Sequence, residues 1–107
     1  MYRLFLLLMV AASTAFGGEI DQPAALTALQ RSDSILIDVR TAQEYANGAL
    51  PGATRIEIQD LAARIASVAP DKNAPVVLYC RTGRRSSAAQ DLLNELGYSQ
   101  VINAGGY

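Results

Sequence analysis

Two short runs of consecutive apolar residues place the strongest constraint on how this chain folds. They span residues 35–37 and 75–79, and neither run alternates polar with apolar side chains. Unbroken runs of this length are typical of strands that are buried on both faces. Asp38 directly follows the first run, and Cys80 directly follows the second. The sequence therefore predicts two central strands of a sheet, one followed by a carboxylate and the other by a thiol.

Helical patterns alternate with these runs. Apolar residues recur at helical spacing over residues 58–65 and 89–96. Asp21 is a suitable N-cap for an earlier helix that has Leu26 and Leu29 on one face. Because strands alternate with helices, the sequence predicts a single α/β domain with a mainly parallel sheet.

Shorter elements complete the expected order. Thr41 and Glu44 have the spacing of a capping box, which predicts a short helix that ends at Gly48. Short strands are expected over residues 54–56 and 101–102, the second followed closely by two glycines.

The first residues have the order of a secretory signal. Arg3 precedes an apolar run over residues 4–12, and mostly small residues follow. The run is shorter than the roughly 20 residues that span a bilayer. Cleavage is expected after Gly17, with Ala15 as the alternative, so residues 1–17 are a predicted signal peptide and residues 18–107 the predicted domain. The expected location is the periplasm, with no stable membrane anchor after processing. A buried helix is the alternative interpretation of the run.

Composition narrows the chemistry that is available. The chain has 107 residues, one cysteine, no histidine and a formal net charge of -1. This composition excludes an internal disulfide, a four-ligand Cys/His zinc site and a strongly basic nucleic-acid binder. Without histidine, catalysis has to use Cys80, carboxylates, arginines or backbone amides. We therefore expect no metal, no organic cofactor and no nucleic-acid partner.

Cys80 stands between a predicted buried strand and a predicted helix. Ligands of open α/β sheets bind beyond the carboxyl ends of strands, which is where this thiol is expected. The segment 81–86 supplies cations, a glycine that lets amides converge, and the start of a helix. Such surroundings lower the pKa of a thiol, although a buried and inert cysteine is the alternative. The candidate site residues are Cys80 as nucleophile, and Arg81, Thr82, Gly83, Arg84, Arg85 and Ser86 as substrate-binding residues. Among the cations, Arg85 is favoured for binding an anion, while Arg81 and Arg84 are expected to point outward at the rim.

These motifs resemble the rhodanese homology domain when they are taken in order. The resemblance covers residues 19–107, and it is greatest to the small exported single-domain rhodaneses of the phage-shock type. It implies a five-stranded, mainly parallel sheet flanked by helices, and sulfur transfer through a persulfide on Cys80. It also implies that loop amides between Arg81 and Arg85 hold the outer sulfur. The residues that carry the resemblance are Asp38-Val39-Arg40, Glu44-Tyr45, the segment 48–53, the loop 80–86, and Gly105-Gly106.

Two departures from the family pattern stand out. Many members have histidine where this chain has Ala49, a position that is usually structural. Members often continue past the double glycine with a further helix, so the end at Tyr107 is expected either to expose part of the core or to weaken the last strand.

Asp38 and Arg40 are candidate supporting residues. A charged pair at a strand end orients the neighbouring loop or caps the helix at Thr41, and a structural role is favoured for both. Glu44 is expected to be a capping-box partner rather than a catalytic acid.

Three functions are compatible with the sequence. The first is a monomeric sulfurtransferase that moves sulfane sulfur from thiosulfate to cyanide or a thiol. The second is a phosphatase or arsenate reductase, whose loops resemble Cys-x5-Arg, but Ser86 occupies the place of that arginine and Arg85 comes one residue too early. The third is a persulfide carrier or anion-binding module that delivers sulfur without turnover.

Overall fold

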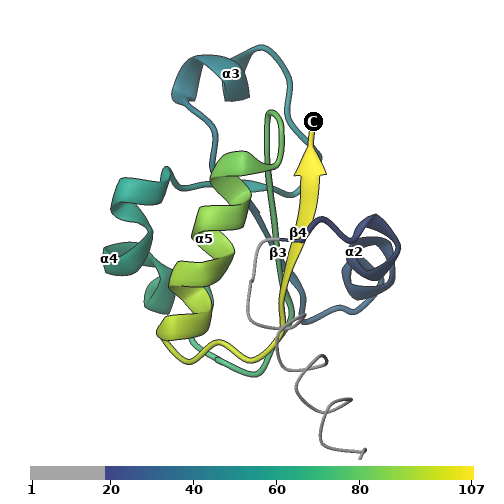
Figure 1. Ribbon diagram of the computed structural model, residues 1–107, viewed down its shortest axis with the longest axis vertical. Coiled ribbons are helices and arrows are strands. Elements are labelled where there is room, and N and C mark those ends of the chain that lie inside the picture. Colours follow the sequence, from purple (N-terminus) through teal and green to yellow (C-terminus); the bar gives the residue numbers. More distant parts are fainter. Residues whose placement is uncertain (1–18) are drawn as a thin grey trace, which may run out of the picture.

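The computed structural model describes residues 19–107, and the predicted signal peptide lies outside the described residues. Helices and strands alternate along most of this segment (Figure 1). In chain order the elements are α2 (Gln22–Leu29), β1 (Ile35–Asp38), α3 (Ala42–Ala46), β2 (Thr54–Arg55), α4 (Ile58–Val68), β3 (Val76–Cys80), α5 (Arg84–Glu95) and β4 (Val101–Gly106).

The strands form one parallel sheet in the order β2-β1-β3-β4. Helices α4 and α5 cover one face of the sheet, and α2 covers the other (Figure 1). The short helix α3 lies beyond the carboxyl ends of the strands. The α/β architecture and the parallel sheet are as the sequence predicts.

The expected fifth strand is wrong for the described residues, which form four strands. At the outer edge of β4, Ile20 makes a single parallel bridge to Asn103, and the Asp21 N–H donates to the Asn103 carbonyl at 2.8 Å. Pairing ends there because Asp21 is already the N-cap of α2 and accepts from the Ala24 N–H. The chain therefore turns into a helix after one paired residue.

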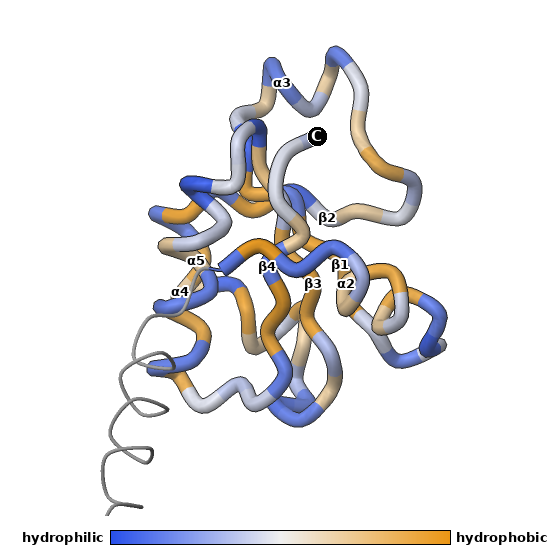
Figure 2. The backbone as a smooth tube through the Cα atoms, turned by 45° about the vertical axis from the view of Figure 1, so that its right-hand side comes forward, coloured by the Kyte–Doolittle hydropathy of each residue, from blue (hydrophilic) through white to orange (hydrophobic). Residues whose placement is uncertain are grey.

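Strand β3 is the centre of the core, and all five of its residues are buried. Val76, Leu78 and Cys80 belong to the apolar cluster under α4 and α5, whereas Val77 belongs to the cluster under α2. This alternation is the strand periodicity of two, with apolar residues on both faces. Figure 2 shows the hydrophobic stretches gathered where the strands run between the helices. Cys80 thus lies on the same side of the sheet as α5.

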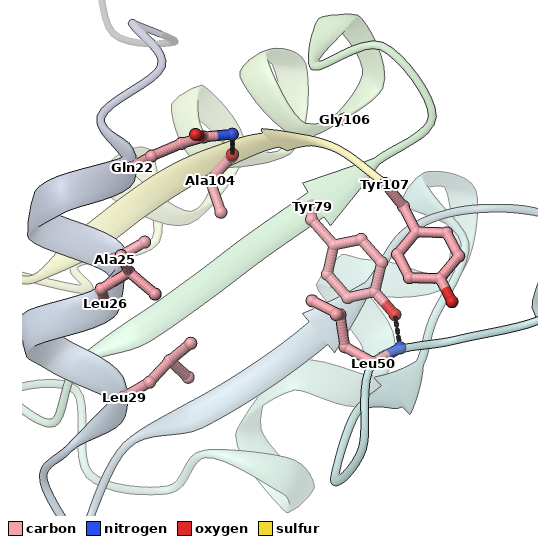
Figure 3. A pocket seen from close by; sticks show the side chains of 9 residues that line it. All are labelled: Gln22, Ala25, Leu26, Leu29, Leu50, Tyr79, Ala104, Gly106 and Tyr107. Carbon is pink, nitrogen blue, oxygen red and sulfur yellow. Dashed lines mark hydrogen bonds between the residues drawn. The ribbon is translucent and has the colours of Figure 1, made fainter.

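Helix α2 forms where the sequence predicts it, but its buried residues are Ala25 and Ala28. Leu26 is 66% exposed, and Leu29 is partly buried. Small side chains let the helix lie close to the sheet around Val77, which leaves Leu26 at the margin. Leu26 lines a shallow apolar groove between α2 and the end of β4, which is shown in Figure 3.

Strand β4 runs to Gly106 and is longer than the sequence predicts. Its register with β3 shifts by one residue, since Leu78 pairs with Asn103 and Tyr79 with Gly105. The bulge carries the double glycine alongside the end of β3, next to Cys80. None of the helices between residues 19 and 107 has the length and apolar character needed to cross a membrane.

Candidate active site

Cys80 is the last residue of β3, and its side chain is fully buried. The chain then makes a tight loop, and α5 begins at Arg84. Gly83 has a φ of +94°, a left-handed conformation that favours glycine. In this conformation the Gly83 N–H donates to Cys80 Sγ at 2.9 Å. The loop therefore directs a backbone donor at the sulfur, as the sequence predicts.

Opposing effects act on the acidity of Cys80. Burial raises the pKa of the thiol. Hydrogen bonds from the Ser86 side chain and from the backbone amides of Ser86, Thr82 and Gly83 lower it, and the resulting pKa is below the ordinary value. The sulfur thus has thiolate-stabilising donors although the chain contains no histidine.

Ser86 and Asn103 form a buried polar cluster behind the sulfur. Ser86 Oγ lies 3.4 Å from Cys80 Sγ and 2.7 Å from Asn103 Oδ1. Asn103 Nδ2 donates to the Gly83 carbonyl at 3.3 Å, and the Gly105 N–H donates to Asn103 Oδ1 at 2.9 Å. Asn103 is not among the site residues that the sequence predicts. The available signal was one amide side chain inside an otherwise apolar last strand, two residues before the first of two consecutive glycines.

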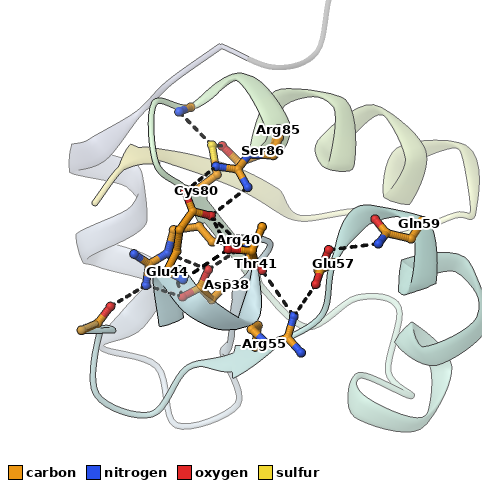
Figure 4. Close-up of polar contacts among 12 residues, drawn as sticks. Asp38, Arg40, Thr41, Glu44, Arg55, Glu57, Gln59, Cys80, Arg85 and Ser86 are labelled. Atoms are coloured by element: carbon orange, nitrogen blue, oxygen red, sulfur yellow. Dashed lines mark hydrogen bonds and ion pairs between the residues drawn. The ribbon is translucent and has the colours of Figure 1, made fainter. Parts of the chain in front are cut away.

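The arginines of the loop occupy two different environments. Arg81 and Arg84 are exposed, as expected for residues at the rim, and Thr82 is exposed as well. Arg85 is half-buried, and its guanidinium donates to both carboxylate oxygens of Glu44 at 3.0 and 3.1 Å (Figure 4). The residue favoured for anion binding therefore already has an anionic partner from α3.

Glu44 makes contacts with two parts of the site. It completes the predicted capping box with Thr41, accepting from the Thr41 N–H at 2.9 Å while its own N–H donates to Thr41 Oγ1. It also forms the ion pair with Arg85. These contacts, first the Arg85 hydrogen bond and then the Thr41 amide, lower the pKa of Glu44 to about 2. Glu44 therefore links α3 to the first turn of α5.

Asp38 and Arg40 form a buried ion pair at the end of β1. Arg40 Nε donates to both Asp38 oxygens at 2.9 and 3.0 Å, and Nη2 donates to Oδ2 at 2.7 Å. Burial raises the pKa of Asp38, but the Arg40 bonds outweigh it and the pKa is lowered. Arg40 Nη2 also donates to the Gly48 carbonyl, and the guanidinium lies 4.5 Å from the ring centroid of Tyr107. These contacts support the structural role that the sequence favours, because they fix the segment after α3.

A polar hollow of about 290 Å³ lies between the loop and α3. The double glycine forms the other boundary of the site, where a side chain on Gly106 would collide with the Arg81 carbonyl. No three His, Cys, Asp or Glu side chains in the described part of the chain are grouped so as to hold a metal ion. The hollow is lined by Arg40, Glu44, Asn47, Gly48, Arg81 and Tyr107.

This fold, with a buried cysteine between a central strand and an amide-rich loop, is that of a rhodanese. The sequence matches the family described as Rhodanese-like domain over residues 22–107, and the chain belongs to that family.

Similar proteins carry sulfur-transfer names. The chain is 44% identical over 70 residues to the thiosulfate sulfurtransferase PspE of Escherichia coli. The alignment covers 65% of this chain and 67% of that protein. It is also 31% identical over 84 residues to the thiosulfate sulfurtransferase GlpE of Pseudomonas entomophila. That alignment covers 78% of this chain and 75% of that protein.

Solved structures are similar in fold as well. A rhodanese with anions from E. coli superposes with a TM-score of 0.67 at 42% identity, covering 68% of this chain and 86% of the other. The human single-domain sulfurtransferase TSTD1 superposes with a TM-score of 0.66 at 31% identity, covering 79% of this chain and 87% of the other.

Proposed function

We propose that this protein is a thiosulfate sulfurtransferase that carries sulfane sulfur as a persulfide on Cys80 and passes it to cyanide or a thiol. The observation that carries the proposal is the Gly83 N–H, which donates to the buried Cys80 sulfur at 2.9 Å at the start of α5. Family membership and the names of the similar proteins support it.

The first half-reaction loads the cysteine. The proton of the Cys80 thiol leaves to solvent, and the thiolate attacks the outer sulfur of thiosulfate. A bond forms between Sγ and that sulfur, the S–S bond of thiosulfate breaks, and its electron pair leaves with sulfite. In the second half-reaction, cyanide or a thiolate attacks the outer sulfur and the Sγ–S bond breaks. Thiocyanate or a new persulfide leaves, and the Cys80 thiolate returns, so ping-pong kinetics are expected.

Loop residues have distinct roles in this scheme. The amides of the segment from Arg81 to Arg85 stabilise the negative charge of the terminal sulfur, as amides stabilise an oxyanion. Arg81 and Arg84, which are exposed, attract the dianionic donor. Arg85 holds the anion from the α5 side while Glu44 fixes its guanidinium.

Sulfur transfer by this route needs no metal and no organic cofactor, because the thiolate and the loop donors supply both nucleophile and charge stabilisation. We also propose that residues 1–17 are removed on export to the periplasm, and that residues 18–107 act as a monomer. Amino-terminal sequencing of the exported protein tests the processing site, with Gly18 as the expected first residue.

A turnover assay separates this function from the two alternatives. Thiosulfate and cyanide in excess over the protein are expected to give many equivalents of thiocyanate, with an aryl phosphate left unchanged. At most one equivalent of thiocyanate per protein would instead indicate a persulfide carrier. Comparable turnover of the aryl phosphate would favour a phosphatase.

A further inference from the structure

Asn103 joins three parts of the candidate site through one side chain. It lies on β4 at the bulge and is fully buried. Its amide contacts Gly83 in the loop, Ser86 on α5 and Gly105 on its own strand. The amide is therefore placed to influence the surroundings of the sulfur through Ser86 and the loop.

Backbone groups fix the orientation of this amide. The Gly105 N–H is only a donor, so the atom that faces it at 2.9 Å is the acceptor Oδ1. The Gly83 carbonyl is only an acceptor, so Nδ2 faces it. Ser86 Oγ lies 2.7 Å from that same Oδ1, and a hydroxyl has one proton to donate. Ser86 therefore donates its proton to Asn103.

This arrangement has a consequence for Cys80. When the Ser86 proton points to Asn103, the oxygen lone pairs are free to accept from the thiol, whose sulfur is 3.4 Å away. A thiolate and the inner sulfur of a persulfide have no proton to donate, so each needs Ser86 as a donor instead. Asn103 Oδ1 keeps the Gly105 N–H when the hydroxyl turns, so no buried acceptor loses its last partner.

We propose that Asn103 is a positioning residue that orients the Ser86 hydroxyl, so that this hydroxyl accepts from the Cys80 thiol and turns to donate to the thiolate and the persulfide. The inference rests on the proposed function, since the thiol, thiolate and persulfide of Cys80 are the states of the proposed sulfur-transfer cycle. In the thiol state the Ser86–Asn103 bond is present, and in the thiolate state it is exchanged for a Ser86–sulfur bond.

Charged and titratable groups lie on the elements around the site, and they are the same in every variant of the test. They act on Cys80 through the electrostatic field, whereas Asn103 is proposed to act through Ser86. On the surrounding elements these groups are Asp38 and Arg40 after β1, Glu44 on α3, Arg81 in the loop, Arg84 and Arg85 on α5, and Tyr107 after β4.

A double-mutant cycle on the pKa of Cys80 tests the proposal. The rate of alkylation by iodoacetamide is measured against pH for the unmutated protein, Asn103→Leu, Ser86→Ala and the double variant. Leucine removes the acceptor that stabilises only the thiol state, and this effect lowers the pKa. Loss of the amide contact to Gly83 acts in both backgrounds and cancels. We expect the shift caused by Asn103→Leu to be more negative by about half to one pKa unit when Ser86 is present.

Ser87→Ala is the matched control, one residue further along α5. The shift caused by Asn103→Leu is expected to be unchanged in that background. Equal shifts of the Cys80 pKa with and without Ser86 would overturn the proposal, because Asn103 would then act on the sulfur independently of the hydroxyl.

A second measurement decides the matter if Asn103→Leu does not fold. The side-chain carbonyl carbon of Asn103 is followed by NMR through the titration of Cys80. We expect its resonance to move at the Cys80 pKa in the unmutated protein and to move much less in Ser86→Ala. A movement of the same size in both proteins would contradict the proposal. Neither measurement uses a sulfur donor, so failure of the proposed sulfur transfer is detected separately, by the thiosulfate assay.

Discussion

Glu44 and Arg85 are 41 residues apart in sequence, and their side chains form two parallel hydrogen bonds of 3.0 and 3.1 Å between α3 and α5. This pairing gives the loop arginine a fixed direction and masks its charge in the absence of substrate. Thiosulfate, the proposed anionic sulfur donor, therefore meets a guanidinium that is already hydrogen-bonded to a carboxylate.

Unmasking Arg85 is expected to strengthen thiosulfate binding. In Glu44→Gln the side-chain carbonyl still accepts from Arg85 and from the Thr41 amide, but the negative charge at the site is gone. We expect the KM for thiosulfate to fall several-fold, with the largest change at low ionic strength. Glu57→Gln is the matched control, since Glu57 pairs with Arg55 at 2.8 Å on another part of the surface. A rise in KM for Glu44→Gln alone would mean that the charge of Glu44 is needed to orient Arg85.

Removing the guanidinium is expected to have the opposite effect. Arg85→Ala should raise the KM for thiosulfate at least about tenfold, the effect of losing one charge-assisted hydrogen bond. Its thermal unfolding should change little, because the side chain is half-buried and paired near the surface. Arg31→Ala changes the net charge equally at a pair with Asp33 before β1. Equal KM values for the two variants would remove Arg85 from the binding site.

The acidity of Glu44 sets the pH range over which its pair persists. Its folded pKa of about 2 lies below the ordinary 4.5, so its contribution to stability is fully present above pH 4.5 and is lost as the pH falls towards 2. No change in thiosulfate KM between about pH 5 and 8 should therefore arise from Glu44. NMR titration of its carboxyl carbon is expected to give a midpoint well below 4.5, and an ordinary midpoint would show that Arg85 does not hold the carboxylate in solution.

The buried Asp38–Arg40 pair is expected to matter for stability. Asp38→Asn removes the charge that compensates Arg40, and breaking such a buried pair costs about 3–5 kcal/mol of unfolding free energy. Urea denaturation measures this loss. Asp33→Asn, at an exposed pair with Arg31, should cost less than about 1 kcal/mol. Similar losses in the two variants would show that the Asp38 pair contributes no more than a surface contact.

The backbone elements around Cys80 could be predicted from the sequence alone. The unbroken apolar run before Cys80 reflects a strand that is covered on both faces. Gly83 takes the left-handed conformation that a tight loop favours for glycine, and Ser86 follows in the first turn of the helix. The same is true of the Thr41–Glu44 capping box, whose contacts are three residues apart. Local patterns therefore predicted β3, the loop and the beginning of α5.

Long-range contacts could not be predicted in the same way. The partner of Arg85 is Glu44, and the partner of Ser86 is Asn103, 17 residues away on β4. Neither pairing has a local spacing rule, because both depend on which elements the sheet brings together. The buried face of α2 differs from the expected one for a related reason. Hydropathy favours Leu26 for burial, while close packing selects Ala25 and Ala28.

Formation of a persulfide on Cys80 is the central claim, and intact-protein mass spectrometry tests it most directly. After incubation with thiosulfate and removal of excess reagent, the protein is expected to gain one sulfur, about 32 Da, and to lose it again when cyanide is added. Cys80→Ser is expected to show neither change, since Cys80 is the single thiol of the chain. An unmodified mass for the unmutated protein, or sulfur transfer retained by Cys80→Ser, would contradict the covalent mechanism.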